Sequence, residues 1–147
     1  MQQRPFGDLD AASALSLGGG GLGQLWGATT REECVATVLE AANLGINVLD
    51  VAPSYGDGEA ERVIGAAFGG TLPTGMRITT KCRIGNTPPA DVYRVLSDSL
   101  SASLERMCLE RVDIMFLHDW VTLNGNSSDR ITTTRVVTEA IAPAFER

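Results

Sequence analysis

The sequence predicts an α/β fold in which helices connect the strands of a parallel sheet. Three observations support this. Four short apolar runs alternate with amphipathic helical patterns, and the runs begin about 32 residues apart, roughly the length of one βα unit. Two of the runs, at Ile46–Asp50 and Val112–His118, are almost continuously apolar, as is typical of strands covered on both faces. Connections of this kind are right-handed crossovers.

The expected strands are short. They are Ala14–Gly18, Ile46–Asp50, Arg77–Lys81 and Val112–His118. The preceding segment, Arg4–Ala14, fits a small hairpin ahead of the first of them.

Helix signals fill the gaps between the strands. Thr30 and Glu33 form a capping box before an apolar stripe that Gly45 ends, and Asp57 is placed to cap a second helix. A third helix begins near Pro89, and a fourth is expected from Ile131 to Ala142, stopping near Pro143. Apolar residues are expected to form the inner face of each of the first three helices. They are Val35, Val38, Leu39 and Ala42 in the first helix, Ala60, Val63, Ile64, Ala67 and Phe68 in the second, and Val92, Leu96, Leu100 and Leu104 in the third. A polar loop is expected at Leu123–Arg130.

Four βα units do not close a (β/α)8 barrel, which needs roughly 250 residues. The 147 residues fit a single domain, 1–147, that is either a small open sheet or the N-terminal half of a larger barrel.

The composition of the chain limits the classes of partner that the protein is expected to bind. A net charge of −6 and a pI near 4.7 argue against a nucleic-acid surface or an anionic membrane as partner, and no apolar run approaches the roughly 20 residues that span a bilayer. The N-terminus lacks a signal-peptide pattern, and three widely spaced cysteines indicate reduced thiols, so we expect a cytoplasmic protein. No Cys/His spacing predicts a metal site.

A glycine run at Leu17–Gly27 contains Gly18, Gly20 and Gly23 in the order of a dinucleotide-binding fingerprint. The surrounding sequence does not fit a dinucleotide-binding fold. In that fold the glycines lead directly into the helix, whereas the helix cap at Thr30 lies several residues past Gly23. No Gly-Lys-Ser/Thr follows, which excludes a P-loop. We interpret the run as a loop above the first strand that lets the backbone approach a ligand closely.

Four polar side chains stand at the ends of three successive strands. Asp50 ends the second, Tyr55 lies in the loop above it, Lys81 ends the third and His118 ends the fourth. The carboxyl ends of parallel strands meet at one rim, so the four are expected to converge. Each one alone also has an ordinary structural explanation.

Their chemistry is complementary. A free phenol ionises near pH 10, and a neighbouring ammonium such as Lys81 favours the phenolate. Asp50 keeps Lys81 charged, and His118 can donate a hydrogen bond to a ligand carbonyl. Together they could supply a proton to an oxygen that develops negative charge.

Three stretches resemble the aldo-keto reductase family: "GINVLDVAPSYGDGEAERVIG", "ITTKCRI" and "SLSASLERMCLERVDIMFLHD". The resemblance implies a parallel (β/α) TIM-barrel type fold, of which the chain supplies about four units, and NADP(H)-dependent interconversion of small carbonyls and alcohols. It implies a catalytic tetrad with Tyr55 as general acid, Lys81 as its modulator, Asp50 as the partner of Lys81 and His118 as the substrate orienter.

Further site residues follow from the resemblance. Trp26 and Trp120 are expected in rim loops beside the substrate, together with Tyr55 and His118, and Gly21, Gly23 and Asp50 near the cofactor. Cys82 should face away from Lys81 and have no catalytic role, while Asp119 adds a negative charge beside His118.

The resemblance also implies that most of the cofactor site belongs to a second half of the barrel. We therefore expect these 147 residues not to bind NADPH tightly or turn over carbonyls on their own, and to self-associate through exposed sheet edges. Two alternatives stay open: a catalytically inert regulatory or binding subunit of the same fold, and an unrelated enzyme that uses Lys81 as a Schiff-base nucleophile.

Overall fold

The structure, a computed structural model, describes residues 1–7, 9–124 and 128–147. The chain forms two compact units, and three elements run from one unit into the other: strand β5 (Arg77–Cys82), helix α3 (Val92–Met107) and strand β6 (Ile114–Leu117). The first unit comprises Met1–Thr80 and Ser103–Met115; the second comprises Lys81–Ala102 and Phe116–Arg147.

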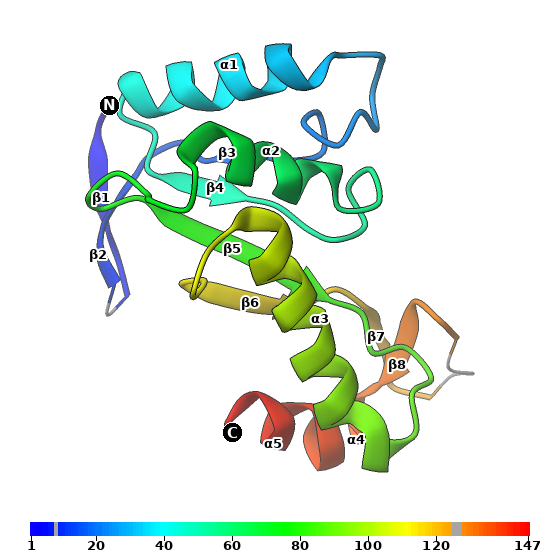
Figure 1. The fold of residues 1–147 in the computed structure, drawn as a ribbon. Helices are drawn as coiled ribbons and strands as arrows, with labels where there is room; N and C mark the ends of the chain where they lie inside the picture. The colour runs from blue at the N-terminus through cyan, green and yellow to red at the C-terminus, as the bar shows by residue number, and fades with distance from the viewer. Residues whose placement is uncertain (8, 125–127) are drawn as a thin grey trace. The chain divides into compact units, whose positions relative to one another are not determined.

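The first unit opens with an antiparallel hairpin of β1 (Gln3–Phe6) and β2 (Leu9–Ser13), as the sequence predicted (Figure 1). The predicted hairpin also contains Asp8, which lies outside the described residues. The backbone N–H of Ser13 donates to Asn47 Oδ1 at 2.7 Å, and the N–H of Asn47 donates to Ser13 Oγ at 3.0 Å. This reciprocal pair fastens the hairpin to the residue directly before strand β4 (Val48–Asp50).

The four predicted strands are present, although all but one are shorter than expected. They are β3 (Leu17–Gly18), β4 (Val48–Asp50), β5 (Arg77–Cys82) and β6 (Ile114–Leu117), in the sheet order β3-β4-β5-β6. β4 pairs in parallel with both β3 and β5. β3 begins later than predicted because the N–H of Ala14 bonds to the carbonyl of Gln2 at 2.8 Å and so belongs to the hairpin.

Helix α1 (Arg31–Asn43) begins at the predicted capping box. The Glu33 N–H donates to Thr30 Oγ1 at 3.2 Å, and the Thr30 N–H donates back to Glu33 Oε2 at 2.8 Å. Its buried face is Cys34, Val38 and Ala41. The prediction that Leu39 faces the core is wrong, since that side chain is 40% exposed.

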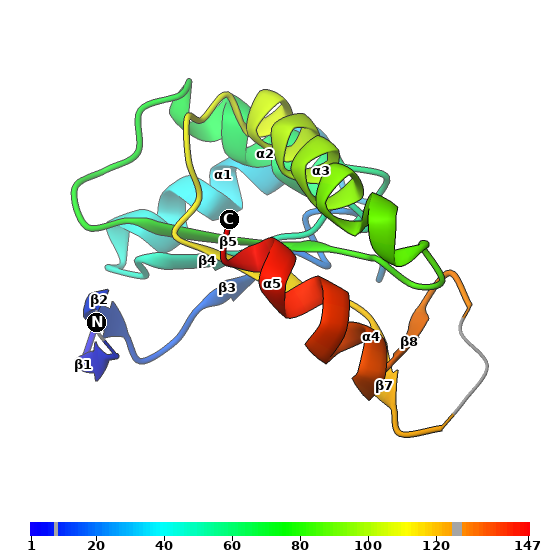
Figure 2. The ribbon, with the colours of Figure 1, turned by 90° about the horizontal axis from the view of Figure 1, so that it is seen from below.

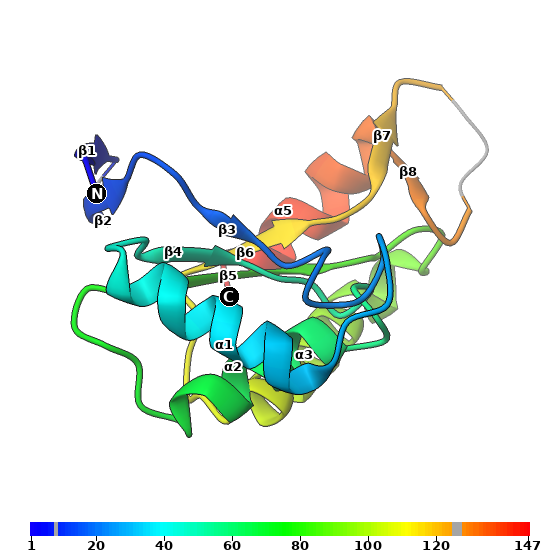
Figure 3. The same cartoon turned by 90° about the horizontal axis from the view of Figure 1, so that it is seen from above.

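Helix α2 (Glu59–Phe68) has the predicted inner face, and Ala60, Val63 and Ile64 are fully buried. The prediction of an Asp57 cap is wrong. Gly58 is the N-cap residue, in the left-handed conformation and with no side-chain cap bond. Figures 2 and 3 show α1 and α2 on the same face of β3 and β4.

These two helices and the sheet enclose the core of the first unit. Its buried members are Leu22, Cys34, Val38, Leu49, Val51, Ala60, Val63, Ile64, Met76, Ile78 and Met107. The core therefore lies directly beneath the loops that follow β3 and β4.

The second unit holds the turn Pro89–Asp91, the first part of α3 (Val92–Met107), β7 (Trp120–Thr122) and β8 (Ile131–Thr133). After them come α4 (Thr134–Val136), a π-helical turn (Val137–Ile141) and α5 (Ala142–Phe145). Part of the predicted polar loop, residues 125–127, lies outside the described residues.

The predicted fourth helix is wrong at both ends. Ile131–Thr133 form β8, which pairs in parallel with β7, and Thr133 then caps the helix by accepting from the Val136 N–H at 3.3 Å. Pro143 does not stop the helical run, because it falls in the first turn of α5, where a missing N–H is tolerated. Across the described part of the chain, no helix is long and apolar enough to cross a membrane.

Candidate active site

Asp50 is the last residue of β4, where the sequence placed it, and it is half-buried. Its register partners are Gly18 on β3 and Thr79 on β5. The Thr79 hydroxyl donates to Asp50 Oδ1 at 2.5 Å, and the Asp50 carbonyl accepts from the N–H of Gly19 at 2.7 Å. Both the backbone and the carboxylate of Asp50 are therefore held by neighbouring segments.

Tyr55 lies in the tight loop between β4 and α2. Its N–H donates to the Ala52 carbonyl at 3.0 Å, and its carbonyl accepts from the N–H of Ala60 at 3.2 Å. The Gly58 N–H closes the loop by donating to Pro53 at 2.7 Å. The half-buried Tyr55 side chain packs against the core of the first unit.

The three residues after Tyr55 all have left-handed backbone conformations, with φ of 67° at Gly56, 52° at Asp57 and 80° at Gly58. Asp57 is the strained member, because a side chain in this region costs roughly 1–2 kcal/mol. Arg62 Nη1 supports it by donating to the Asp57 carbonyl at 2.9 Å. Local hydrogen bonds therefore hold the backbone of this loop in place.

The glycine loop, residues 19–27 after β3, lies against the tyrosine loop, residues 51–58 between β4 and α2. A Cβ on Gly23 would lie 2.4 Å from the carbonyl carbon of Tyr55 and 2.8 Å from the Gly56 nitrogen. Gly20 is covered in a different way, because a Cβ there would lie 2.7 Å from the indole of Trp26. Trp26 otherwise faces solvent, with 80% of its surface exposed.

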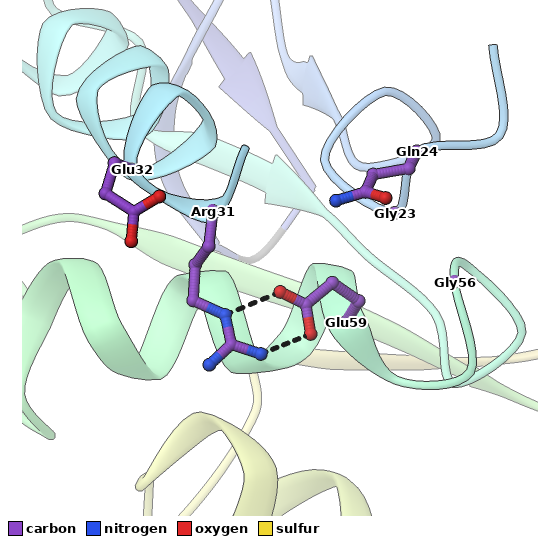
Figure 4. A pocket seen from close by; sticks show the side chains of 6 residues that line it. All are labelled: Gly23, Gln24, Arg31, Glu32, Gly56 and Glu59. Atoms are coloured by element: carbon purple, nitrogen blue, oxygen red, sulfur yellow. Dashed lines mark hydrogen bonds and ion pairs between the residues drawn. The ribbon is translucent and has the colours of Figure 1, made fainter. Parts of the chain in front are cut away.

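An open hollow of about 520 Å³ borders the two loops (Figure 4). Its lining residues are Gly23, Gln24, Arg31, Glu32, Gly56 and Glu59. Arg31, at the start of α1, points at Glu59, at the start of α2, and makes two hydrogen bonds of 2.6 Å with its carboxylate. The hydrogen bond from Arg31 lowers the pKa of Glu59, and burial opposes it more weakly.

The second unit contains the other predicted catalytic residues. Lys81 is the penultimate residue of β5 and is half-buried, while the next residue, Cys82, is buried. This difference fits the expectation that the two side chains face opposite sides. Burial raises the pKa of the Cys82 thiol, and a hydrogen bond from Ser99 opposes the shift. Trp120 begins β7 and is 77% exposed.

His118 follows β6 directly, and its N–H donates to the Cys82 carbonyl at 2.8 Å. Asp119 has a structural role that the sequence did not indicate. Asp119 Oδ2 accepts from the N–H of Ile84 at 3.0 Å and from the N–H of Gly85 at 2.6 Å. The carboxylate beside His118 therefore ties down the loop that follows β5.

Asp50 and Tyr55 belong to the first unit, while Lys81 and His118 belong to the second. The convergence of all four side chains therefore stays a prediction. Within the first unit, the loops carrying Gly23 and Tyr55 are in direct contact. Among the described residues, no group of three or more His, Cys, Asp or Glu side chains is arranged to hold a metal ion.

Sequence reasoning missed a set of polar residues around the end of β5. Thr79 precedes Lys81 by two positions and so shares its face of the sheet, a signal that could have singled it out. Thr80 faces the helices, where its hydroxyl donates to the fully buried Glu61 at 2.7 Å. Arg106 Nε donates to the same carboxylate at 2.6 Å.

With this geometry in place, comparison with known proteins defines the class. Residues 14–142 match the aldo/keto reductase family, and the chain belongs to that family. It is 36% identical over 110 residues to L-galactose dehydrogenase of Arabidopsis thaliana, covering 73% of this chain and 34% of that protein. It is 31% identical over 138 residues to the NADH-specific methylglyoxal reductase of Escherichia coli, covering 80% of this chain and 42% of that protein.

Solved structures agree with this assignment. An aldo-keto reductase from Bacillus halodurans in its holo form matches with a TM-score of 0.72 and 25% identity, over 99% of this chain and 45% of that one. Another from Klebsiella pneumoniae, in complex with NADPH, matches with a TM-score of 0.65 and 26% identity, over 86% of this chain and 41% of that one. The predicted TIM-barrel type fold is confirmed. The chain spans between about a third and a half of the length of these relatives.

Proposed function

We propose that the protein takes part in NADP(H)-dependent reduction of an aldehyde or ketone to an alcohol, or the reverse reaction, with Tyr55 as the general acid. The observation that carries the proposal is the Tyr55 loop, which follows β4 directly and has its backbone held on both sides. A proton donor must be held in place to act, and the hydrogen bonds of this loop support that task for Tyr55.

Each tetrad residue has a stated task. Tyr55 gives its proton to the carbonyl oxygen as negative charge develops there, and Lys81 favours the resulting phenolate. Asp50 holds the ammonium of Lys81, and His118 orients the carbonyl by donating a hydrogen bond to its oxygen. The bond from the Thr79 hydroxyl to Asp50 Oδ1 supports this assignment, because it holds the Asp50 carboxylate in place.

The proposed cofactor contacts depend on which glycines have open space beside them. A Cβ on Gly21 would make only ordinary contacts, with the nearest atom, on Trp26, 3.7 Å away. We propose that Gly21 and Asp50 approach the cofactor, with Gly23 supporting the loop. When bound, the nicotinamide supplies the hydride. The solved structure in complex with NADPH supports NADP(H), whereas the relative named as NADH-specific favours NADH, so both belong in the test.

The substrate is expected to be a small carbonyl or alcohol, with Trp26 and Trp120 lining its site. A cytoplasmic location is supported by three free cysteines, which are typical of a reducing compartment. Self-association is supported by the sheet order, in which β3 and β6 are the outer strands. Light scattering that gives the mass of a monomer over a range of concentrations would contradict it.

The experiment is carbonyl reduction by the purified 147-residue chain, followed at 340 nm with NADPH and separately with NADH. Each cofactor is supplied at high concentration because we expect weak binding, and turnover by the chain would contradict the expectation that these residues are inactive on their own. Tyr55→Phe should lower the rate by about 10²–10⁴-fold, the usual worth of a general acid. Tyr93→Phe is the matched control, because Tyr93 is the only other tyrosine and is exposed on α3.

Three results would argue against the proposal. One is a Tyr55→Phe variant as active as the parent, and another is a Tyr93→Phe variant that loses as much activity. The third is a parent chain with no reduction and no fluorescence change with either cofactor, which favours an inert or regulatory subunit.

A further inference from the structure

The glycine loop and the tyrosine loop touch through their backbones, with no side chain between them. A Cβ on Gly23 would lie 2.4 Å from the Tyr55 carbonyl carbon and 2.5 Å from its oxygen. In the other direction, a Cβ on Gly56 would lie 2.4 Å from the Gly23 carbonyl oxygen. Ordinary contacts of a Cβ begin near 3.4 Å, so neither position can hold a side chain unless the loops separate by about 1 Å.

The need for glycine at position 23 comes from space alone. Gly56 also has a left-handed φ of 67°, but Gly23 does not have a positive φ. An alanine at position 23 would therefore be acceptable to its own backbone and would act only by pushing on Tyr55. The effect of that push can be isolated from backbone strain.

Tyr55 cannot easily yield to such a push. Its N–H is bonded to Ala52, and its carbonyl, the group that faces Gly23, accepts from the first turn of α2 at Ala60. Helix α2 has no side-chain cap, so this carbonyl and that of Gly56 are the acceptors for the first amides of the helix. Displacing the Tyr55 peptide would thus disturb the helix start, and both ends of the loop resist movement.

Gly21, two residues earlier in the same loop, differs in this respect. A Cβ there meets only the Trp26 ring, at 3.7 and 3.9 Å, and the φ of Gly21 is also not positive. The two glycines are alike in the sequence but have opposite steric demands.

We propose that Gly23 is a positioning residue for Tyr55. The glycine loop braces the backbone of the tyrosine loop and thereby fixes where the phenol stands. This inference rests on the proposed function, in which Tyr55 is the proton donor. A misplacement of about 1 Å can cost a catalytic group on the order of a hundredfold in rate, so the brace controls turnover without touching substrate.

The test uses the 147-residue chain carrying Tyr93→Phe, so that Tyr55 is the sole tyrosine, labelled with ¹³C at the ring carbon that bears the hydroxyl. Gly23→Ala should shift the Tyr55 resonance, whereas the matched Gly21→Ala should leave it unchanged. If the resonance of the Gly23→Ala chain overlays that of its parent, the proposal is overturned, whatever the activity.

A second measurement needs no substitution and covers the case in which Gly23→Ala fails to fold. In the unaltered chain, the Hα protons of Gly23 and the amide proton of Gly56 should give a strong nuclear Overhauser effect. Absence of that signal in a folded sample overturns the contact and the proposal with it.

Kinetics separate this inference from the proposed function. Gly23→Ala should lower kcat at least tenfold and change KM for the carbonyl less than threefold, because it misplaces the donor without removing a substrate contact. A Tyr55→Phe chain with the parent's activity refutes the proposed function, and the Tyr55 resonance still decides whether Gly23 holds the loop. An unchanged kcat in Gly23→Ala, beside an inactive Tyr55→Phe, refutes the positioning role alone.

Discussion

Arg106→Met should be among the most destabilising single changes in the first unit. Arg106 donates through Nε to Glu61 Oε2 at 2.6 Å and through Nη2 to Ser103 Oγ at 3.2 Å. The Glu61 side chain has no exposed surface, and its other bond is with the Thr80 hydroxyl. Methionine keeps most of the apolar stem of arginine but leaves the Glu61 carboxylate with one neutral donor.

The magnitude follows from what is lost. A hydrogen bond to a charged group contributes about 1.5–3 kcal/mol, and a carboxylate left buried without its cation raises the cost of breaking the pair to about 3–5 kcal/mol. A domain of this size is stable by only about 5–15 kcal/mol, so the variant should lose a large share of that margin.

The assay is urea unfolding at pH 7, followed by circular dichroism. Arg94→Met is the control on the same helix, because Arg94 is 64% exposed and, among the residues that the structure describes, pairs only with Asp91 and Asp98; it should cost less than about 1 kcal/mol. The double variant Glu61→Met/Arg106→Met should recover at least about half of the loss, because apolar replacement of a whole buried pair is often tolerated. Equal losses in Arg106→Met and Arg94→Met, or strict additivity in the double variant, would refute the reasoning.

Three other outcomes are expected. Arg31 lowers the pKa of Glu59, so this pair stabilises the fold above pH 4.5 and the benefit fades as the pH falls below that value; Arg31→Met should lower the urea midpoint at pH 7, and by progressively less as the pH is lowered below 4.5. Burial raises the pKa of Cys82 above 9.0, so stability should fall as the pH rises past that value, and Cys82→Ala should flatten this slope in thermal melts between pH 8 and pH 10.5. Thr79→Val should cost about 1–3 kcal/mol in urea unfolding by removing the hydroxyl that donates to Asp50 Oδ1, and Thr79→Ser should keep most of that stability; equal stability of the two variants would contradict this.

The sequence predicted well wherever a structural signal is local. The capping box of Thr30 and Glu33 is contained within four residues, so α1 began where it was expected. The predicted cap of α2 was wrong because the first amides of the helix donate to the backbone carbonyls of Tyr55 and Gly56. The positions of these carbonyls depend on a loop with left-handed backbone conformations. The apolar and β-branched residues of Ile131–Thr133 suit a strand as well as a helix, and pairing with β7 decided between them.

In the candidate site, too, some features could be predicted from the sequence and others could not. The positions of Asp50, Lys81 and His118 follow from the alternation of strands and helices, which places strand ends at known points of the chain. The roles of Gly21 and Gly23 could not be separated, because the difference lies in what a loop distant in sequence brings against each one. Spacing between glycines carries no record of that contact.

The polar residues at the end of β5 hold this part of the strand through hydrogen bonds on its two faces. Successive side chains of a strand face opposite sides, so Thr79 bonds to Asp50 within the sheet while Thr80 bonds to Glu61 on the helix side. The backbone just before Lys81 is thus held from both faces, and a change at either threonine should act on the residue that follows. Tyr55, by contrast, lies in a loop whose backbone is in direct contact with the loop that carries Gly23. The proposed acid should therefore be sensitive to added volume in the neighbouring loop, and Lys81 to the loss of hydrogen bonds.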